Sequence, residues 1–205
     1  MSNILLTGAG GYIGSHAVKR LLQDGHKFVA FDNFSRGYRE PLEILSKYGD
    51  LVVVEGDLCV KDDIKNIFKK EKIDAVMHFA ALCLVDESTQ KPEMYFKNNA
   101  LGTLNLLEAM MENSVAKLIF SSTCAVYGNA EYLPIDEKHR TIPENPYGES
   151  KLMAEKMISW FGKAHGLKYV ILRYFNVSGA DSDGEIGDSK KPSQLLVQNA
   201  VRSAL

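Results

Sequence analysis

The sequence predicts an α/β protein built around a doubly wound parallel sheet. Short apolar runs alternate with longer stretches of helical period along most of the chain, which is the pattern of strand–helix units around such a sheet. A glycine-rich turn follows the first apolar run. The composition, with 45% hydrophobic and 24% charged residues among 205, indicates a globular chain with a large core rather than a disordered one.

The elements follow in order along the chain. Six apolar runs are expected to be strands, at residues 4–6, 28–31, 51–54, 75–79, 118–120 and 169–172. The stretches of helical period are expected to be helices, at residues 13–23, 40–48, 61–70, 92–113 and 146–165. The continuous runs at 28–31 and 51–54 are typical of strands buried on both faces. Gly25 suits a helix C-terminus, and Asn145 and Pro146 suit the N-cap and the first position of the last helix.

Charge and cysteine content exclude several classes of protein. Lys+Arg 24 against Asp+Glu 26 leaves a net charge of -2, so we expect neither a nucleic-acid partner nor binding to an anionic membrane. Cys59, Cys83 and Cys124 form no CxxC pair and no even set, which predicts reduced thiols in a cytoplasmic protein. No basic region precedes the first apolar run, and no stretch approaches the ~20 apolar residues of a membrane span. We expect a chain that is neither exported nor inserted.

The first strand–helix turn predicts a nucleotide site. Gly8, Gly11 and Gly14 lie between the first strand and the first helix, where glycines let the backbone approach a pyrophosphate whose charge the helix N-terminus attracts. This spacing differs from the GxGxxG of common dehydrogenases, in which the last glycine would fall at Ile13. A purely structural turn is the alternative for an isolated glycine loop. The strand before this loop and the amphipathic helix after it favour a Rossmann-type site.

Two acidic residues point to the adenosine half of a dinucleotide. Asp32 ends the second strand, where a carboxylate can accept hydrogen bonds from both ribose hydroxyls, so NAD is favoured over NADP. Arg36 is either a solvated loop cation or a partner for the 2′-phosphate of NADP. Asp57 follows the third strand and could accept from the adenine amino group while Leu58 packs on the ring; a helix-capping aspartate is the alternative.

A tyrosine and a lysine predict the chemistry. Tyr147 and Lys151 are four residues apart on the last helix, so the phenol and the ammonium share one face. With the positive ring of an oxidised cofactor, the ammonium would lower the pKa of Tyr147 toward working pH and make it a general base. Thr123 ends the fifth strand, at the sheet edge where ligands bind, and offers its hydroxyl to the same site. A packed tyrosine beside a solvated lysine is the alternative for an isolated pair.

Taken together, these segments resemble the extended short-chain dehydrogenase/reductase family, and within it the epimerases of sugar nucleotides. The resemblance runs from residue 4 to about residue 187. The matching residues are 11–16 (GYIGSH), 32–33, 56–57, 78–81 (HFAA), 87–88, 92, 98–99, 121–123 (SST), 126–128 (VYG), 146–151 (PYGESK) and 173–176 (RYFN).

The resemblance implies a reaction. NAD would take a hydride from C4 of a UDP-hexose, UDP-glucose or UDP-galactose, and return it to the other face of a transient 4-keto sugar. Tyr147 would remove and return the 4-hydroxyl proton, Lys151 would hold the nicotinamide ribose, and Thr123 would hydrogen-bond the reacting oxygen. The resemblance also implies a homodimer, paired through the helices that begin at Pro92 and Pro146.

The same resemblance implies which residues line the cofactor and the substrate. The expected cofactor-binding residues are Gly8, Gly11, Tyr12, Ile13, Gly14, Asp32, Asn33, Phe34, Ser35, Arg36, Gly37, Asp57, Leu58, Phe79, Ala80, Ala81, Leu82, Cys83, Asn98, Ser121, Tyr147, Lys151 and Phe175. The expected substrate-binding residues are Thr123, Tyr147, Asn176, Gln194 and Leu195. No metal ligand is expected.

Two departures from the family pattern leave alternatives open. Cys83 stands where many relatives carry lysine, and Gln194 with Leu195 replaces the usual Asn-Leu or His-Leu pair. Dehydratases of the family need an acid/base pair directly after the residue equivalent to Thr123. Cys124 and Ala125 stand there instead, so elimination lacks its proton carriers. A non-catalytic NAD-binding fragment is the other alternative.

The character of the chain changes near its end. A polar loop over residues 179–184 is followed by apolar residues at helical period, and the sequence stops in mid-pattern. We expect an NAD-binding Rossmann domain over residues 1–180 and the start of an incomplete substrate-binding region over residues 181–205. The remainder of that region would lie outside this sequence.

Overall fold

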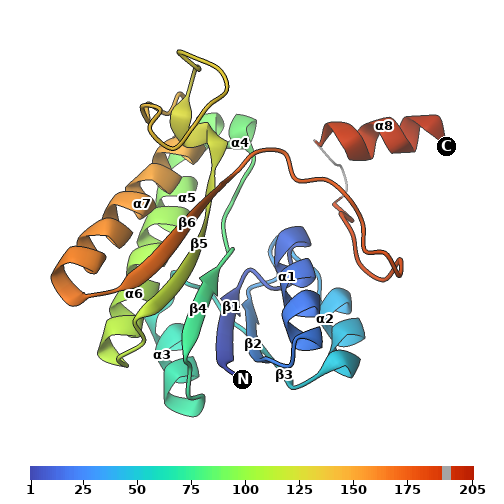
Figure 1. Ribbon diagram of the computed structural model, residues 1–205, viewed down its shortest axis with the longest axis vertical. Coiled ribbons are helices and arrows are strands. Elements are labelled where there is room, and N and C mark those ends of the chain that lie inside the picture. The colour runs from blue at the N-terminus through green and yellow to red at the C-terminus, as the bar shows by residue number, and fades with distance from the viewer. Residues whose placement is uncertain (191–194) are drawn as a thin grey trace.

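The described residues form a six-stranded parallel sheet in the order β3-β2-β1-β4-β5-β6 (Figure 1). The computed structural model describes residues 1–190 and 195–205. The strands are β1 (Asn3–Thr7), β2 (Lys27–Asp32), β3 (Leu51–Glu55), β4 (Ala75–His78), β5 (Lys117–Thr123) and β6 (Lys168–Tyr174). The order reverses between β1 and β4, so the predicted doubly wound sheet is confirmed.

Helices pack on both faces of the sheet (Figure 1). On one face lie α1 (Tyr12–Gln23) and α2 (Glu40–Leu45), and on the other lie α3 (Lys61–Lys70), α6 (Gly102–Glu112) and α7 (Pro146–His165). Alternation along β1 divides the core, because successive side chains of a strand point to opposite faces. Leu5 is buried among residues of α3, α6 and α7, whereas Ile4 and Leu6 are buried with residues of α1 and α2.

Local sequence signals set the ends of α7 and α1. The Asn145 side chain accepts from the Gly148 N–H at 2.9 Å, and Pro146 is the first residue of α7. Gly166 then ends α7 with a φ of +72°. Gly25, with a φ of +82°, follows α1 in the same way. These predicted caps are confirmed.

Two sequence predictions are corrected. β3 is not buried on both faces, because it lies at the edge of the sheet, where Val52 and Val53 remain 38% and 40% exposed. The helix expected over residues 92–113 is divided into α5 (Pro92–Tyr95), a π-helical segment (Phe96–Leu101) and α6. A π-helical segment has its own period, which the apolar pattern does not reveal. The structure also adds α4 (Val85–Gln90) and ends α2 in a 3-10 turn at Ser46–Tyr48.

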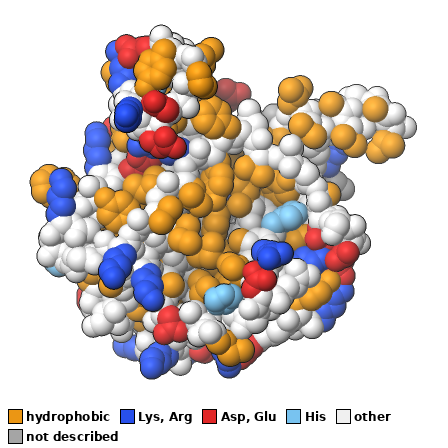
Figure 2. Space-filling view, viewed as in Figure 1, with side chains coloured by type: hydrophobic (Ala, Val, Ile, Leu, Met, Phe, Trp, Pro, Cys, Tyr) orange, Lys and Arg blue, Asp and Glu red, His pale blue; other side chains and the backbone are white. Residues whose placement is uncertain are grey.

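Hydrophobic side chains remain at the surface over the β4–β6 side of the sheet (Figure 2). In β6, Tyr169, Val170 and Leu172 are all exposed. The last helix, α8 (Leu196–Ala204), buries none of its residues and lies apart from α7 in Figure 1. Of the helices described, none combines the length and the apolar character needed to cross a bilayer.

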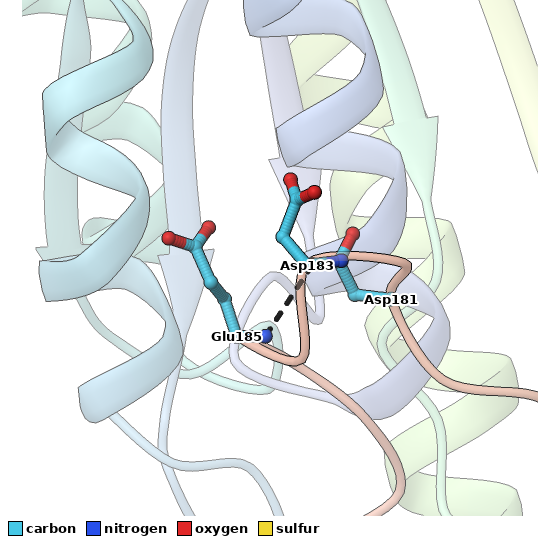
Figure 3. A group of neighbouring side chains, drawn as sticks. All are labelled: Asp181, Asp183 and Glu185. Carbon is cyan, nitrogen blue, oxygen red and sulfur yellow. Dashed lines mark hydrogen bonds between the residues drawn. The ribbon is translucent and has the colours of Figure 1, made fainter.

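The chain after β6 returns to α1 and is fixed there. The Lys19 ammonium donates to Asp181, Asp183 and Glu185 at 2.7, 2.9 and 3.1 Å, and Figure 3 shows the three carboxylates grouped on this loop. Their oxygens lie within 4.8 Å of one another, close enough to share a cation. In this chain the lysine supplies that charge. Ile186 follows directly and is buried on the α1 side of the core.

Gly14→Ala is expected to destabilise the fold by about 2 kcal/mol, because overpacking of this kind costs roughly 1–3 kcal/mol. A Cβ on Gly14 would lie 2.1 Å from the Gly8 carbonyl oxygen. Urea denaturation followed by circular dichroism measures the change. Gly25→Asn is the matched control, since Gly25 also has a positive φ but nothing lies within 4 Å of its Cβ position, and asparagine tolerates that conformation. Unchanged stability of Gly14→Ala would contradict the close approach.

Candidate functional site

The glycine loop lies at the point where the strand order reverses. Gly8 follows β1 with a φ of +77°, and a Cβ on it would lie 2.5 Å from the backbone nitrogen of Ala80 in the loop after β4. Gly11 is the N-cap of α1, and no side chain caps this helix. The first-turn N–H groups, such as those of Tyr12 and Ile13, have no partner within the helix. A bare helix N-terminus beneath a loop without side chains fits the pyrophosphate of a dinucleotide.

Asp32, at the end of β2, joins this loop to the next. Its carboxylate accepts from the backbone N–H groups of Gly10 at 2.9 Å and of Phe34 at 2.8 Å. Burial raises the pKa of Asp32, although these hydrogen bonds act against it. A Cβ on Gly37 would lie 3.1 Å from Asp32 Oδ2, so the loop wraps the carboxylate closely. Asn33 and Ser35 lie in the same loop, with the Ser35 N–H donating to the Asn33 side chain at 3.0 Å.

Arg36 carries a balanced charge. Its guanidinium donates to both carboxylate oxygens of Glu87 at 2.8 Å, and Glu87 also accepts from the Tyr95 hydroxyl at 2.9 Å. This ion pair links the loop after β2 to α4. Because Glu87 already balances the guanidinium, the alternative that Arg36 binds a 2′-phosphate is weakened.

Asp57 and Leu58 are placed differently from the simplest expectation. The Asp57 carboxylate accepts from the Asn33 side-chain amide at 3.0 Å and from the Cys59 N–H at 2.7 Å. Burial acts to raise the pKa of Asp57, but these hydrogen bonds outweigh it and the pKa is lowered. Asp57 is not a helix cap, because the N-cap of α3 is Val60. Leu58 is buried in the larger core, which leaves little of its surface for an adenine ring.

The three residues expected to carry the chemistry come together where β5 ends. Tyr147 is the second residue of α7, and its phenol is hydrogen-bonded to the Thr123 side chain. The phenol ring meets the Tyr95 ring edge-on, with the ring centroids 6.3 Å apart. Lys151 is buried one turn further along α7, and its ammonium lies 4.2 Å from the centre of the Phe120 ring.

The expected direction of the Tyr147 pKa shift is wrong for the chain by itself. Burial raises the pKa of Tyr147 to about 12, and the hydrogen bond with Thr123 opposes this only in part. Burial also lowers the pKa of Lys151 to about 7, against the opposing charges of Cys83 and Glu155. Loss of hydration therefore acts on each group more strongly than the two groups act on each other.

The remaining expected residues lie at the same sheet edge or beyond it. Ser121 belongs to β5, residues 79–83 form the loop after β4, and Asn98 lies in the π-helical segment. Phe175 and Asn176 follow β6 and are exposed. Leu195 is the N-cap of α8, and the structure does not bring α8 against α7 (Figure 1). Gln194 lies outside the described residues.

Sequence reasoning missed the residues that support Tyr147 and Lys151. Glu155 is buried one turn beyond Lys151 and accepts from the Arg173 guanidinium at 3.1 and 2.7 Å. The Asn99 side chain, in the π-helical segment, donates to the Ser150 hydroxyl of α7 at 3.0 Å. Asn99 and Arg173 belong to the matching motifs, but these pairings join distant segments, so spacing alone carries no signal for them.

Comparisons with known proteins agree with this geometry. The profile of the NAD dependent epimerase/dehydratase family matches residues 4–202. A UDP-glucose 4-epimerase of Lactobacillus helveticus is 45% identical over 98% of this chain and 60% of its own length. A putative UDP-arabinose 4-epimerase of Arabidopsis thaliana is 44% identical over 100% of this chain and 48% of its own length. The crystal structure of a UDP-glucose 4-epimerase from Brucella ovis in complex with NAD matches with a TM-score of 0.92 and 42% identity, over 100% of this chain and 61% of that one.

Lys151→Met is expected to stabilise the fold near pH 7. The pKa of Lys151 is lowered from 10.5 to about 7 in the fold, so the unfolded chain binds the extra proton and wild-type stability rises with pH between those values. The variant should lose this rise and gain roughly 2–4 kcal/mol near neutral pH, since one pKa unit corresponds to about 1.4 kcal/mol. Urea denaturation between pH 6 and 10 measures it. Lys156→Met, at an exposed position of α7, is the control, and the same pH slope in all three proteins would contradict the buried lysine.

Proposed function

The chain belongs to the NAD dependent epimerase/dehydratase family, and we propose on this premise that the complete protein interconverts UDP-glucose and UDP-galactose by epimerisation at C4. One observation carries the proposal: Thr123 and Tyr147 are hydrogen-bonded at the end of β5, one turn from Lys151. The likeness to UDP-glucose 4-epimerases along nearly the whole chain supports it. The chain spans about 60% of the length of those relatives, so activity, substrate and partners are proposed for the whole protein.

The residues at the switch point would hold NAD. The first-turn N–H groups of Tyr12 and Ile13 would bind the pyrophosphate, and Asp32 would bind the adenosine ribose. Lys151 would hold the nicotinamide ribose. Bound NAD would supply the acceptor for the hydride at C4 of the hexose and return it to the opposite face.

Tyr147 would carry the proton of the 4-hydroxyl, and Thr123 would hydrogen-bond the same oxygen. A phenol with a pKa of about 12 is a poor base near neutral pH. Two positive charges would lower that pKa once the site is loaded: the Lys151 ammonium, which the charge of Glu155 favours, and the ring of oxidised NAD. We therefore propose that Tyr147 becomes an effective base only in the loaded site.

The dehydratase alternative fits less well. Its chemistry needs an acid and a base directly after Thr123, but Cys124 and Ala125 begin a 3-10 turn there. Alanine carries no exchangeable proton, so one of the two roles is vacant. A protein that binds NAD without catalysis keeps every cofactor contact described above, and the activity assay below separates that alternative from the proposal.

We also propose a cytoplasmic homodimer. The three cysteines are all free, which suits a reducing compartment. The π-helical segment and α7 expose apolar side chains, including Leu101, Met153 and Trp160. These side chains support pairing through the two helical stretches that begin at Pro92 and Pro146.

Tyr147→Phe is expected to lower turnover of UDP-galactose by at least about 1000-fold while NAD binding changes little, because proton transfer contributes roughly 100- to 10,000-fold in such sites. An assay of the complete gene product, coupled to oxidation of UDP-glucose, measures turnover. Tyr169→Phe, on exposed β6, is the control and should remain active. Full activity of Tyr147→Phe would remove Tyr147 from the base role.

NAD is expected to bind at least about tenfold more tightly than NADP, because the buried Asp32 carboxylate repels a 2′-phosphate. Calorimetric titration with each dinucleotide measures the preference. Asp32→Asn should narrow it, since the amide keeps an acceptor for the Gly10 N–H but loses the charge. Equal affinities in the wild-type protein would contradict the assignment of Asp32.

A further inference from the structure

A four-residue segment, Gly187–Lys190, crosses the glycine loop; we call it the strap. It lines a cavity of about 10 Å³ together with Gly10, Gly11 and Tyr12. That volume is about the least that can hold a single water molecule. A pyrophosphate cannot lie over the N-terminus of α1 while the strap stays in this position.

The strap is firmly held at one end only. Before it, the Tyr12 hydroxyl donates to the Gly179 carbonyl at 2.6 Å, and Ile186 is buried. After it, the Gln198 side chain donates to the Asp188 carbonyl at 2.6 Å, but Gln198 belongs to α8, which buries no residue. At Gly187 a Cβ would meet its nearest atom at 3.6 Å, so the backbone has room there. The strap can therefore swing about Gly187 while residues 179–186 stay on α1.

Lys190 carries a charge that no acid balances. Its ammonium reaches the Cys83 sulfur, in the loop after β4, at 3.6 Å. Among the residues that the structure describes, no carboxylate lies within ion-pair distance of this ammonium. Arg36, which lines the same cavity, is instead matched by Glu87. Lys190 thus places a cation across the crevice between the loops after β1 and β4, which is where a doubly wound sheet binds its ligand.

Asp188 places the opposite charge nearest the helix. It lines the cavity beside the uncapped start of α1. Its Oδ1 accepts from the Lys190 N–H at 3.4 Å, and its buried Oδ2 has no hydrogen-bond partner among the described residues. A carboxylate at a helix N-terminus is favoured there for the same reason as a phosphate. Asp188 and a pyrophosphate would therefore compete for one place.

We propose that the strap gates the dinucleotide site: Asp188 leaves the N-terminus of α1 as the pyrophosphate enters, and Lys190 then pairs with that pyrophosphate. This inference rests on the proposed function, since it takes NAD as the ligand. It adds a cofactor-binding residue that lies outside every motif of the nucleotide fold. It also gives the two charged strap residues opposite effects on affinity.

Titration of the chain with NADH, followed by fluorescence at low and high salt, tests the proposal. Lys190→Gln should weaken binding about tenfold at low salt, with a smaller difference at ~1 M salt, where the Debye length falls to about 3 Å. Lys190→Arg should bind within about threefold of wild type, because it keeps a phosphate-binding cation. Asp188→Asn should bind at least about threefold more tightly, because the competing charge is gone.

Lys168→Gln, at the opposite end of β6, is the matched control and should bind like wild type. Circular dichroism spectra of all variants show that they are folded. Lys190→Gln that binds like wild type, or that is weakened equally at both salt concentrations, overturns the gate, and so does weaker binding by Asp188→Asn. A wild-type chain that binds no NADH overturns the proposed function together with the gate, whereas binding by wild type with unaltered variants overturns the gate alone.

Discussion

The arrangement of functional groups in this chain depends on how closely the glycine loop packs beneath α1. Backbone meets backbone where Gly14 lies on the Gly8 carbonyl, at a distance that no side chain would allow. Because of this contact, α1 begins directly after β1 and its uncapped end faces the point where the strand order reverses. Asp32 reaches the Gly10 N–H for the same reason. The loop, the carboxylate and the strap are thus held in register by the absence of two methyl groups.

The other end of the crevice has the opposite character, since large polar side chains are buried there. Tyr147 and Lys151 both lose hydration, and each is driven toward its neutral form. The fold offsets this cost nearby, where Glu155 and Arg173 form a buried, doubly hydrogen-bonded pair. Such a site is stabilised by a ligand that brings charge with it, because the ligand restores the field that water no longer supplies. Stability and chemistry are therefore opposed at the end of β5.

The sequence predicts the fold and the local parts of the site, because both are encoded over short distances. Apolar runs indicate strands, and Asn145 with Pro146 marks the start of α7. Tyr147 and Lys151 share a face because they are one helical turn apart. Burial is predicted less well, since the exposure of Val52 follows from strand order, which no single run reveals. The sign of the Tyr147 pKa shift, like the pairing of Arg36 with Glu87, depends on segments that meet only in the folded chain.

The grip of Lys19 on the loop after β6 has a consequence for biosynthesis. Its three carboxylate partners lie 162 to 166 residues further along the chain. While a ribosome makes the protein, α1 can form early, but its lysine remains without those partners until almost the whole sheet has emerged. Contacts between such distant positions close slowly, because a long loop must first be ordered. The nucleotide pocket is therefore begun by the first residues translated and completed by nearly the last.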